Sequence, residues 1–456
     1  MTPDEISALA SALAPIPVID DPALVKQKSR DFYWYSPILK PQLRQLTADL
    51  VVMPRSTAEV VVVARECARR RIPLTVRGAG TGNYGQAMPL QGGIVLDLSD
   101  MTAIRAFANG VIRVEPGIKL IDLEAATLPS GWELRFHPST RRTATIGGFV
   151  AGGSSGIGSI NYGLLRDRGS VLGLKVVTLE PEPRILELRG DDVQKVIHAY
   201  GTNGIIVELD IPLARAWPWV DAIATFPSFM EAARFGQALG EADGIIKKLI
   251  TPVEWSAAQY FKPLRPHLPD GRSIVITMIA EPSLTGFDAL VREAGGTVPY
   301  LRRPETPGYD EVPPLYEFTW NHTTLHALKA DRTITYLQTL FPQPDCLAKI
   351  EHMHRHFGDE TPMHLEFVRL NGQVGCFGLQ LVRFTTPKRL NEIIAYHEAQ
   401  GCPIFNPHTC ILEDGGMKEI DHAQLDFKRL ADPLGLLNPG KMRGWLEASK
   451  WVKAAS

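Results

Sequence analysis

The first half of the chain alternates short apolar runs with amphipathic segments. Residues 50–54 have the pattern of a buried strand, 56–71 repeat apolar positions at helical spacing, and 72–77 form a second apolar run. Ser56 and Glu59 match the capping box that opens a helix. A strand, a helix and a second strand predict a βαβ unit whose two strands are parallel.

The same alternation continues to about residue 215. The pattern predicts helices over 118–128 and around 191–199, and strands over 92–98, 110–117, 171–180 and 204–213. These elements predict an α+β nucleotide-binding domain over residues 1–216.

A different order of elements follows residue 217. Strands are predicted at 220–226, 246–252, 273–280, 363–370 and 374–384, with helices near 227–239, 284–294, 344–357 and 386–399. Two passes of the βαββαβ type fit this order, which predicts an antiparallel sheet with helices on one face. The expected division is a first domain over 1–216, a second over 217–404, and a C-terminal segment over 405–456 that returns to the first.

Composition excludes several classes of protein. Of 456 residues, 45% are hydrophobic and 21% charged, and 48 basic against 50 acidic side chains give a formal net charge of −2. These values rule out a largely disordered chain. They also give no overall field for nucleic acid or for an anionic membrane, so neither partner is expected.

Cysteine usage and the N-terminal residues predict a cytoplasmic protein. The five cysteines are an odd number without CxxC spacing, which disfavours a disulfide framework and a zinc ribbon. The N-terminus carries acidic residues and no basic stretch before an apolar core, so a secretory signal is not expected. No apolar run reaches the roughly 18 residues of a membrane span.

Glycines concentrate in two segments, 78–93 and 147–173. The first contains Gly80-x-Gly82-x-x-Gly85, the spacing of the dinucleotide fingerprint. That fingerprint must open a helix, whereas the residues that follow Gly85 have no helical period, so an NAD-binding Rossmann domain is disfavoured. Successive backbone amides in two glycine segments can instead form a concave anion site for a diphosphate.

At this point the sequence resembles the FAD-binding domain of the vanillyl-alcohol oxidase and p-cresol methylhydroxylase (PCMH) flavoproteins, nearest the branch of glycolate oxidase and D-lactate dehydrogenase. The matching pieces keep their order over about 50–213 and again at 432–442: Pro54-Arg-Ser-Thr-x-Glu-Val60, Arg77-Gly-Ala-Gly-Thr-Gly82, Gly92-Gly-Ile-Val-Leu-Asp-Leu98, Pro116-Gly117, Thr145-Ile-Gly-Gly148, Tyr162-Gly163, Gly204-Ile-Ile206 and Leu437-Asn-Pro-Gly-Lys441.

The resemblance implies a fold and a cofactor. In that family two α+β subdomains clamp an extended FAD, and a cap domain lies over the isoalloxazine ring. Carried onto this sequence, it implies FAD contacts at Pro54, Arg77, Gly78, Ala79, Gly80, Thr81, Gly82, Asn83, Tyr84, Pro138, Ser139, Thr145, Gly147, Gly148, Gly152, Ser154, Gly156, Gly204, Ile206, Asn438 and Lys441.

Two departures from the family pattern refine the expectation. Relatives that link the flavin through the first loop have histidine where Thr81 stands, and residues 131–163 lack cysteine. Dissociable FAD is therefore expected, although a link from a cap histidine stays open. Metal-using 2-hydroxy-acid dehydrogenases carry a cap motif rich in His, Gly and Asp, which residues 363–369 lack. No metal is therefore expected, and D-2-hydroxyglutarate and D-lactate are disfavoured as substrates.

Five residues are candidates for the chemistry. Histidine suits transfer of a hydroxyl proton because its pKa lies near 7. His408 precedes the segment that returns to the first domain, with an exposed loop as the alternative. Trp320 and His322 belong to a dense aromatic and polar cluster, Trp320-Asn-His-Thr-Thr-Leu-His326, whose alternative is a packed helix start capped by Asn321. Glu366 could orient a base, and Arg383 could bind a substrate carboxylate or lie on the surface.

Two further aromatic and histidine clusters stay ambiguous. Three histidines at 352, 354 and 356 resemble a metal tract, but a helix would place only two on one face, which favours a surface helix. Residues 31–35, Asp-Phe-Tyr-Trp-Tyr, either plug the interface with the cap or pack as plain core.

The sequence therefore predicts an FAD-dependent oxidoreductase that oxidises an alcohol or a 2-hydroxy acid. A flavin-binding subunit of a multi-subunit dehydrogenase is the first alternative, and a flavoprotein transferase without net redox is the second. The expected partners are a small-molecule substrate and an electron acceptor, which is O2, a quinone or a protein. A homodimer is left open.

Overall fold

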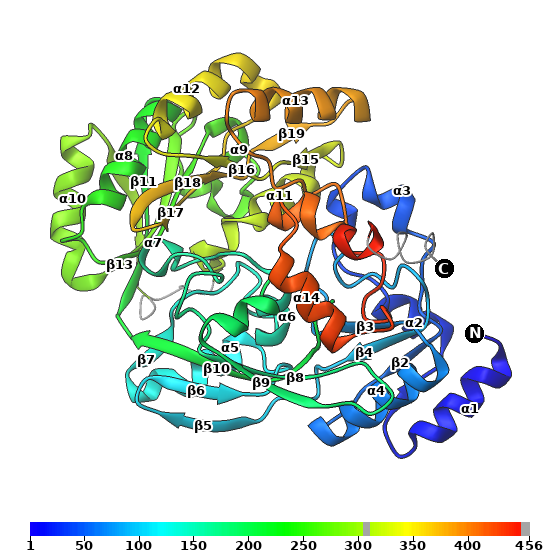
Figure 1. Cartoon of the computed structure of the whole chain (residues 1–456). Helices are drawn as coiled ribbons and strands as arrows, with labels where there is room; N and C mark the ends of the chain where they lie inside the picture. The colour runs from blue at the N-terminus through cyan, green and yellow to red at the C-terminus, as the bar shows by residue number, and fades with distance from the viewer. Residues whose placement is uncertain (304–310, 448–456) are drawn as a thin grey trace.

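The computed structural model describes residues 1–303 and 311–447. Figure 1 shows an α+β molecule in which the N-terminal half forms two sheet-and-helix layers and the second half lies over them as a cap. The α+β class expected from the sequence is confirmed. The domain boundaries at 216/217 and 404/405 stay a prediction.

The first subdomain holds the predicted βαβ unit. Its sheet has the order β1-β2-β4-β3, with β2, β4 and β3 parallel and β1 antiparallel to β2. The predicted pair β2 and β3 is parallel, but β4 lies between them. The strands are β1 (Val18–Ile19), β2 (Leu50–Val52), β3 (Leu74–Arg77) and β4 (Ile94–Asp97), and the helices are α1 (Pro3–Leu13), α2 (Pro22–Lys28), α3 (Leu39–Leu43) and α4 (Thr57–Arg70).

Helix α4 starts as its sequence predicts, with one change at the cap. Ser56 is the N-cap, and its side chain accepts from the Glu59 amide at 3.2 Å. The Glu59 carboxylate accepts from the Arg55 amide at 2.6 Å rather than from that of Ser56, so only half of the capping box forms. The helix buries Val60, Val63 and neighbouring small residues against the sheet.

The second subdomain is an antiparallel sheet of order β5-β6-β10-β8-β9, with β7 paired to β10. The strands are β5 (Ile104–Ala108), β6 (Val111–Val114), β7 (Trp132–Leu134), β8 (Gly173–Val177), β9 (Ile185–Arg189) and β10 (Ile205–Arg215), and the helices are α5 (Leu120–Thr127), α6 (Ile146–Gly152) and α7 (Ser159–Tyr162). The helix expected around 191–199 is instead a 3₁₀ helix over Gly190–Lys195. Positive φ angles at His198 (57°) and Tyr200 (53°) end any helical path there.

The cap begins with one complete βαββαβ pass. Its strands β11 (Trp219–Phe226), β12 (Lys247–Val253), β13 (Ser273–Ala280) and β14 (Thr297–Arg302) form an antiparallel sheet of order β12-β13-β11-β14. Helices α8 (Phe229–Glu241) and α10 (Leu284–Glu293) connect them, together with the short α9 (Trp255–Ala258).

The second pass corrects the expectation of one sheet. Its strands split into a pair, β15 (Ile334–Tyr336) with β19 (Leu381–Arg383), and a triplet, β16 (Thr339–Phe341), β18 (Gln373–Gly378) and β17 (Leu365–Leu370). The strand predicted over 374–384 is interrupted at Leu379 and Gln380, where pairing changes from β16, opposite Gly378, to β15, opposite Leu381. The helices are α11 (Asn321–Ala330), α12 (Cys346–Phe357) and α13 (Pro387–Ala399).

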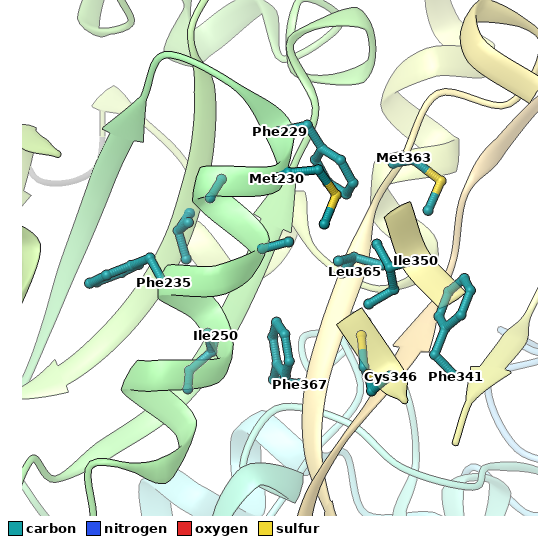
Figure 2. Close-up of a cluster of buried hydrophobic side chains, with 14 of the residues drawn as sticks. Phe229, Met230, Phe235, Ile250, Phe341, Cys346, Ile350, Met363, Leu365 and Phe367 are labelled. Atoms are coloured by element: carbon teal, nitrogen blue, oxygen red, sulfur yellow. The ribbon is translucent and has the colours of Figure 1, made fainter. Parts of the chain in front are cut away.

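Buried apolar side chains join the two passes of the cap. Figure 2 shows Phe367 of β17 in the middle of this cluster, with Phe235 of α8 on one side of it and Cys346 of α12 on the other. Gly236 faces Phe367 so closely that a Cβ there would lie 2.6 Å from the ring. The cap core is thus closed by contact between segments about 130 residues apart.

The C-terminal segment returns to the first half of the chain, as Figure 1 shows for α14 (His422–Ala431). Lys428 is buried, and its ammonium donates to the carbonyls of Thr202 and Leu437 and to Asp432 at 2.6 Å. Leu437 continues into a parallel bridge with Leu74 of β3. These contacts fix the last described residues beside the first glycine segment.

Candidate FAD and substrate site

One cavity of about 320 Å³ runs between the two subdomains and the cap. The described residues that line it and that the sequence had predicted for FAD are Arg77, Gly78, Ala79, Gly80, Thr81, Gly82, Asn83, Tyr84, Pro138, Ser139, Thr145, Gly147, Gly148, Gly152, Ser154, Gly204 and Ile206. The structure therefore brings both glycine segments and the 204–206 turn to one cavity.

The first glycine segment presents its amides to this cavity. No helix follows Gly85 before β4, in agreement with the rejected Rossmann assignment. Across the described chain, the amides of residues 79–84 donate to no other protein group. Free amides in a tight turn are the donors that a diphosphate uses.

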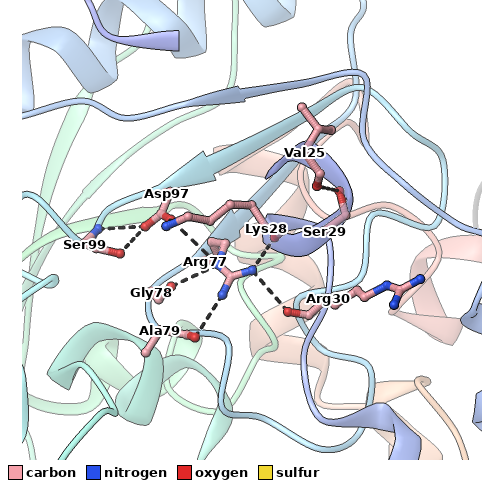
Figure 3. A network of polar contacts seen from close by, with 9 residues as sticks. All are labelled: Val25, Lys28, Ser29, Arg30, Arg77, Gly78, Ala79, Asp97 and Ser99. Atoms are coloured by element: carbon pink, nitrogen blue, oxygen red, sulfur yellow. Dashed lines mark hydrogen bonds and ion pairs between the residues drawn. The ribbon is translucent and has the colours of Figure 1, made fainter. Parts of the chain in front are cut away.

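Arg77 shapes this turn from behind. Figure 3 shows its buried guanidinium among backbone carbonyls: it donates to Gly78 at 3.0 Å, to Ala79 at 2.9 Å and to Arg30 at 3.1 Å, and also to Lys28. Burial lowers the pKa of Arg77, and the nearby Asp97 carboxylate opposes that shift. Because the carbonyls turn toward Arg77, the amides of the turn are left for a ligand.

The second glycine segment meets the first in direct contact. Thr145 is the N-cap of α6, and its hydroxyl accepts from the Gly148 amide at 3.3 Å. A Cβ on Gly78 would lie 2.0 Å from that hydroxyl, and a Cβ on Gly147 would lie 2.5 Å from the Pro116 ring. Glycine is required at both positions, because Gly78 lies this close to Thr145 across the cavity and Gly147 lies this close to Pro116.

Four predicted cofactor contacts lie outside the cavity wall. Asn438 donates to the Gln86 and Tyr200 carbonyls, and Lys441 donates to the Gly85 carbonyl, so both hold the wall from behind. Gly156 packs against the His137 carbonyl, and Pro54 follows β2 at a distance from the lining residues. Burial lowers the pKa of Lys441 to about 8.

Asp31 is a support that the sequence did not single out. Its carboxylate accepts from the Tyr33 amide at 3.0 Å and from the Ala87 amide at 3.1 Å, and burial raises its pKa to about 6. Phe32 and Tyr35 line the cavity, while Tyr35 also accepts from Thr335 of the cap through its carbonyl. The segment 31–35 thus lies at the interface with the cap.

The cap closes the cavity with aromatic and uncharged polar side chains. They are Trp320, Asn321, His322, Gln338, Phe377, Leu379 and Phe405. Two of the five catalytic candidates, Trp320 and His322, are therefore at the cavity. Burial lowers the pKa of His322 to about 4, so the ring is neutral at pH 7.

Helix α11 corrects the alternative for this cluster. Trp320, not Asn321, occupies the N-cap, with φ 52° and ψ −139°, and Asn321 is the first helical residue. His322 and His326 lie on the same helix, but His326 stacks on Phe318 and its Nε2 faces the Glu317 carbonyl at 3.2 Å. Only His322 of the two lines the cavity.

A polar bridge crosses from the glycine segment to the cap. The Tyr84 hydroxyl donates to Gln338 Oε1, and Gln338 Nε2 lies 3.4 Å from Asn321 Oδ1. Burial raises the pKa of Tyr84 well above its usual value, so the phenol keeps its proton. Tyr84 therefore fixes the cap wall as well as lining the cavity.

His408, Arg383 and Glu366 are not lining residues. His408 is 7% exposed, with Nδ1 2.8 Å from the Ser36 hydroxyl and Nε2 3.0 Å from the Tyr336 carbonyl. This corrects the expectation that it faces the flavin and also the exposed-loop alternative. Arg383 donates to the Asp359 carbonyl at 2.9 Å, away from the cavity. Glu366 is buried behind Trp320.

Several lining residues had no signal in the sequence. Gln86, Arg166, His198, Tyr200 and Gln338 reach the cavity from loops and strand ends that pattern analysis leaves undefined. Arg166 pairs with Asp421 at 2.7 Å, and His198 Nδ1 lies 2.6 Å from the Gly153 carbonyl. Of these five residues, His198 and Tyr200 are distinguished by a positive φ, which is a property of the folded backbone and cannot be read from the sequence.

Among residues 1–303 and 311–447, no group of three or more His, Cys, Asp or Glu side chains is arranged to hold a metal ion. His352 instead lies 2.9 Å from the Tyr396 hydroxyl, and His354 lies 3.2 Å from Glu254. None of the helices in the described part is both long enough and apolar enough to cross a membrane.

A match to a known protein family is consistent with a cofactor site in this cavity. The family model described as "FAD binding domain" matches residues 48–188, so this part of the chain is an FAD-binding domain of that family. The free amides and the glycine-lined walls fit its cofactor, and FAD is the cofactor of this domain.

Curated relatives match over part of their length. The glycolate oxidase subunit GlcD of Bacillus subtilis is 30% identical over 188 residues, which are 39% of this chain and 39% of that protein. The D-lactate dehydrogenase of Anaerostipes hadrus is 32% identical over 215 residues, 42% of this chain and 44% of that one. The match thus spans about two fifths of each of these relatives.

The fold extends beyond the matched sequence. A structure of alkyldihydroxyacetonephosphate synthase superposes with a TM-score of 0.72, covering 96% of this chain and 86% of that one at 16% identity. At that identity the likeness concerns the fold, which includes the cap.

Proposed function

Because residues 48–188 are an FAD-binding domain, we propose that this protein is an FAD-dependent oxidoreductase that oxidises an alcohol or a 2-hydroxy acid. One observation carries the proposal: the cavity of the glycine segments continues into a cap wall that holds a neutral histidine. The relatives support it, since their names include glycolate oxidase and D-lactate dehydrogenase.

The roles of the residues follow from their positions. Amides of residues 79–84 and of Ser154 and Ser155 would hold the diphosphate and the polar edge of FAD. When bound, FAD supplies an acceptor for the hydride that leaves the substrate carbon. A ring nitrogen of His322 would take the hydroxyl proton, so that the C–OH group ends as a carbonyl. Trp320, Phe377, Leu379 and Phe405 would exclude water.

The first test is the visible spectrum of the purified protein before and after acid precipitation. A flavin spectrum that moves to the supernatant supports dissociable FAD, as Thr81 implies. Anaerobic additions of glycolate, D-lactate and uncharged alcohols should then bleach the flavin with at least one compound. Failure of every compound, with dithionite still bleaching, would reject oxidation of a CH–OH group.

A second candidate is a flavin-binding subunit of a larger dehydrogenase. It is favoured by one observation, the word "subunit" in the name of the GlcD relatives. This candidate predicts flavin bleaching by substrate but no turnover of the isolated chain with artificial dyes. A complete enzyme would reduce the dye. We keep the cytoplasm as the proposed location, on the five free cysteines, and a homodimer stays a prediction.

A further inference from the structure

Glu366 is a buried carboxylate directly behind the cap wall. It is 1% exposed and lies on β17. Two donors satisfy it, the Trp320 amide at 2.6 Å and the Thr251 hydroxyl at 2.6 Å, and His364 Nε2 lies 2.8 Å from the same carboxylate. Such a carboxylate is expensive to bury, so its donors define a rigid junction.

The Trp320 amide is the donor with a consequence for the site. Its backbone has φ 52° and ψ −139°, a conformation that is strained for a residue with a Cβ. Hydrogen bonds to a carboxylate are among the strongest in proteins, and this one is short. The bond to Glu366 therefore holds Trp320 in a backbone conformation that it would otherwise leave.

Trp320 forms part of the surface that the cap presents to the cavity. It packs against the buried cluster of Val368, Phe377 and Leu379, of which Phe377 and Leu379 line the cavity. The residue also begins α11, so its backbone sets where His322 enters the wall. The residues around Glu366 also contact the wall at Leu379, because His364 Nδ1 lies 3.2 Å from the Leu379 carbonyl.

We propose that Glu366 is a positioning residue, whose carboxylate holds Trp320 and, through the start of α11, His322 against the flavin cavity. The inference rests on the proposed function for its kinetic readout only. It assigns Glu366 no contact with substrate or cofactor. The position of the wall depends on the length of the Glu366 side chain and not on its charge.

The test compares two conservative variants. E366Q keeps the length of the side chain and an oxygen that can accept from the Trp320 amide, whereas E366D keeps the charge but withdraws the acceptor by one methylene. We expect E366Q to stay within about threefold of the parent in the rate of flavin reduction. We expect E366D to lose about 10–100-fold, since small misplacements of site groups cost this much. The affinity for FAD should change less than about twofold in both.

The visible circular dichroism of bound FAD provides a readout that needs no substrate. E366D should change this signal and E366Q should not. T251V is the matched control, because it removes a donor from the same carboxylate without touching Trp320, and its spectrum should equal that of the parent. All three variants are made in the full chain loaded with FAD.

A backbone test isolates the route through Trp320. Glycine adopts positive φ freely, so W320G removes the need to hold this backbone. The loss of melting temperature caused by E366D should be smaller in W320G than in the parent.

Three results would overturn the inference: E366Q as impaired as E366D, T251V as impaired as E366D, or losses that add fully in the double variant. If no alcohol or hydroxy acid bleaches the parent, the proposed function fails, but the dichroism of the FAD-loaded variants still decides the role of Glu366.

Discussion

The two sides of the cavity are built in different ways. The wall formed by the subdomains consists largely of glycine-rich backbone, and Gly78 lets the first turn approach Thr145 at the start of α6. The cap wall consists of side chains from four separate segments, 320–322, 338, 377–379 and 405. Backbone recognition demands glycine and so marks the sequence, whereas a side-chain wall can be made by many residue types.

The two walls of the cavity also have different roles. The glycine side offers free amides and holds its shape through buried ionic groups such as Arg77. The cap side offers one neutral histidine and apolar surface. Changes on the first side should therefore affect cofactor binding, and changes on the second should affect the rate of the reaction.

The largest effect is expected for H322N. If His322 takes the hydroxyl proton, its loss should slow flavin reduction about 10²–10⁴-fold, the usual contribution of a general base. FAD affinity should stay within about twofold. Stopped-flow absorbance under anaerobic conditions measures the rate. H352N, at an exposed histidine of the cap, is the control, and equal rates in the two variants would remove His322 from the chemistry.

On the glycine-lined side of the cavity, G78A should weaken the binding of FAD. A Cβ at this position would lie 2.0 Å from the Thr145 hydroxyl, and such overpacking costs about 1–3 kcal/mol. We expect the Kd for FAD to rise about 10–100-fold, measured by titration of apoprotein with FAD. G244A, at an exposed glycine with no atom within 4 Å of the added Cβ, should bind FAD like the parent. Unchanged affinity in G78A would contradict the close contact of the two walls.

Stability should fall as the pH falls from about 6.5 toward 4. Burial lowers the pKa of His198, His322, His326 and His408 to about 4, so these rings stay neutral in the folded protein while they would charge when unfolded. The unfolded state thus binds more protons in this window. Asp31, whose pKa is raised to about 6, acts in the opposite direction and offsets one of them.

H408Q isolates one of these protons away from the cavity. Each histidine contributes about 1.4 kcal/mol per pH unit to the slope of unfolding free energy. The slope between pH 6 and pH 5 should therefore be shallower by about this amount in H408Q, measured by denaturant unfolding. An unchanged slope would mean that the ring is not held neutral.

The smallest effect is expected for Y84F. It removes the hydrogen bond from the glycine segment to Gln338 of the cap, worth about 0.5–1.5 kcal/mol. The melting temperature should fall slightly, and both FAD affinity and reduction rate should drop no more than about tenfold. Y33F is a control at another buried tyrosine, which packs with Leu39, Leu43 and Met88 and does not line the cavity. A loss confined to one side would show that Tyr84 serves that side alone.

The sequence predicted many elements of the first half of the molecule, because the spacing of apolar residues follows the buried face of each helix or strand. Strands β2, β3, β4, β6, β8 and β10 and helices α4 and α5 lie where apolar periodicity placed them. Periodicity failed where side chains and turns decide, as at the 3₁₀ helix of Gly190–Lys195 and at the break at Leu379. The first is followed by positive φ angles at His198 and Tyr200, and the second lies where the strand changes its partner from β16 to β15.

The candidate site divides in the same way. Seventeen of the residues named for FAD from the glycine motifs and the family resemblance line the cavity, whereas His408, Glu366 and Arg383 do not. Histidine and acidic residues suit both catalysis and buried structural roles, and only the packing around them separates the two. His408 is bound on both nitrogens by Ser36 and Tyr336, which lie far from it in sequence.

The sequence alone determined the glycine-built cofactor wall, because backbone geometry permits few residues at positions such as Gly78 and Gly147. Tertiary structure decided the rest of the cap wall, of which the sequence had indicated Trp320 and His322. The positive φ of Trp320, the carboxylate behind it and the reach of Gln338 to Tyr84 arise from contacts between segments 46 to 254 residues apart. No local pattern encodes such contacts, because their free energy comes from packing that exists only in the folded chain.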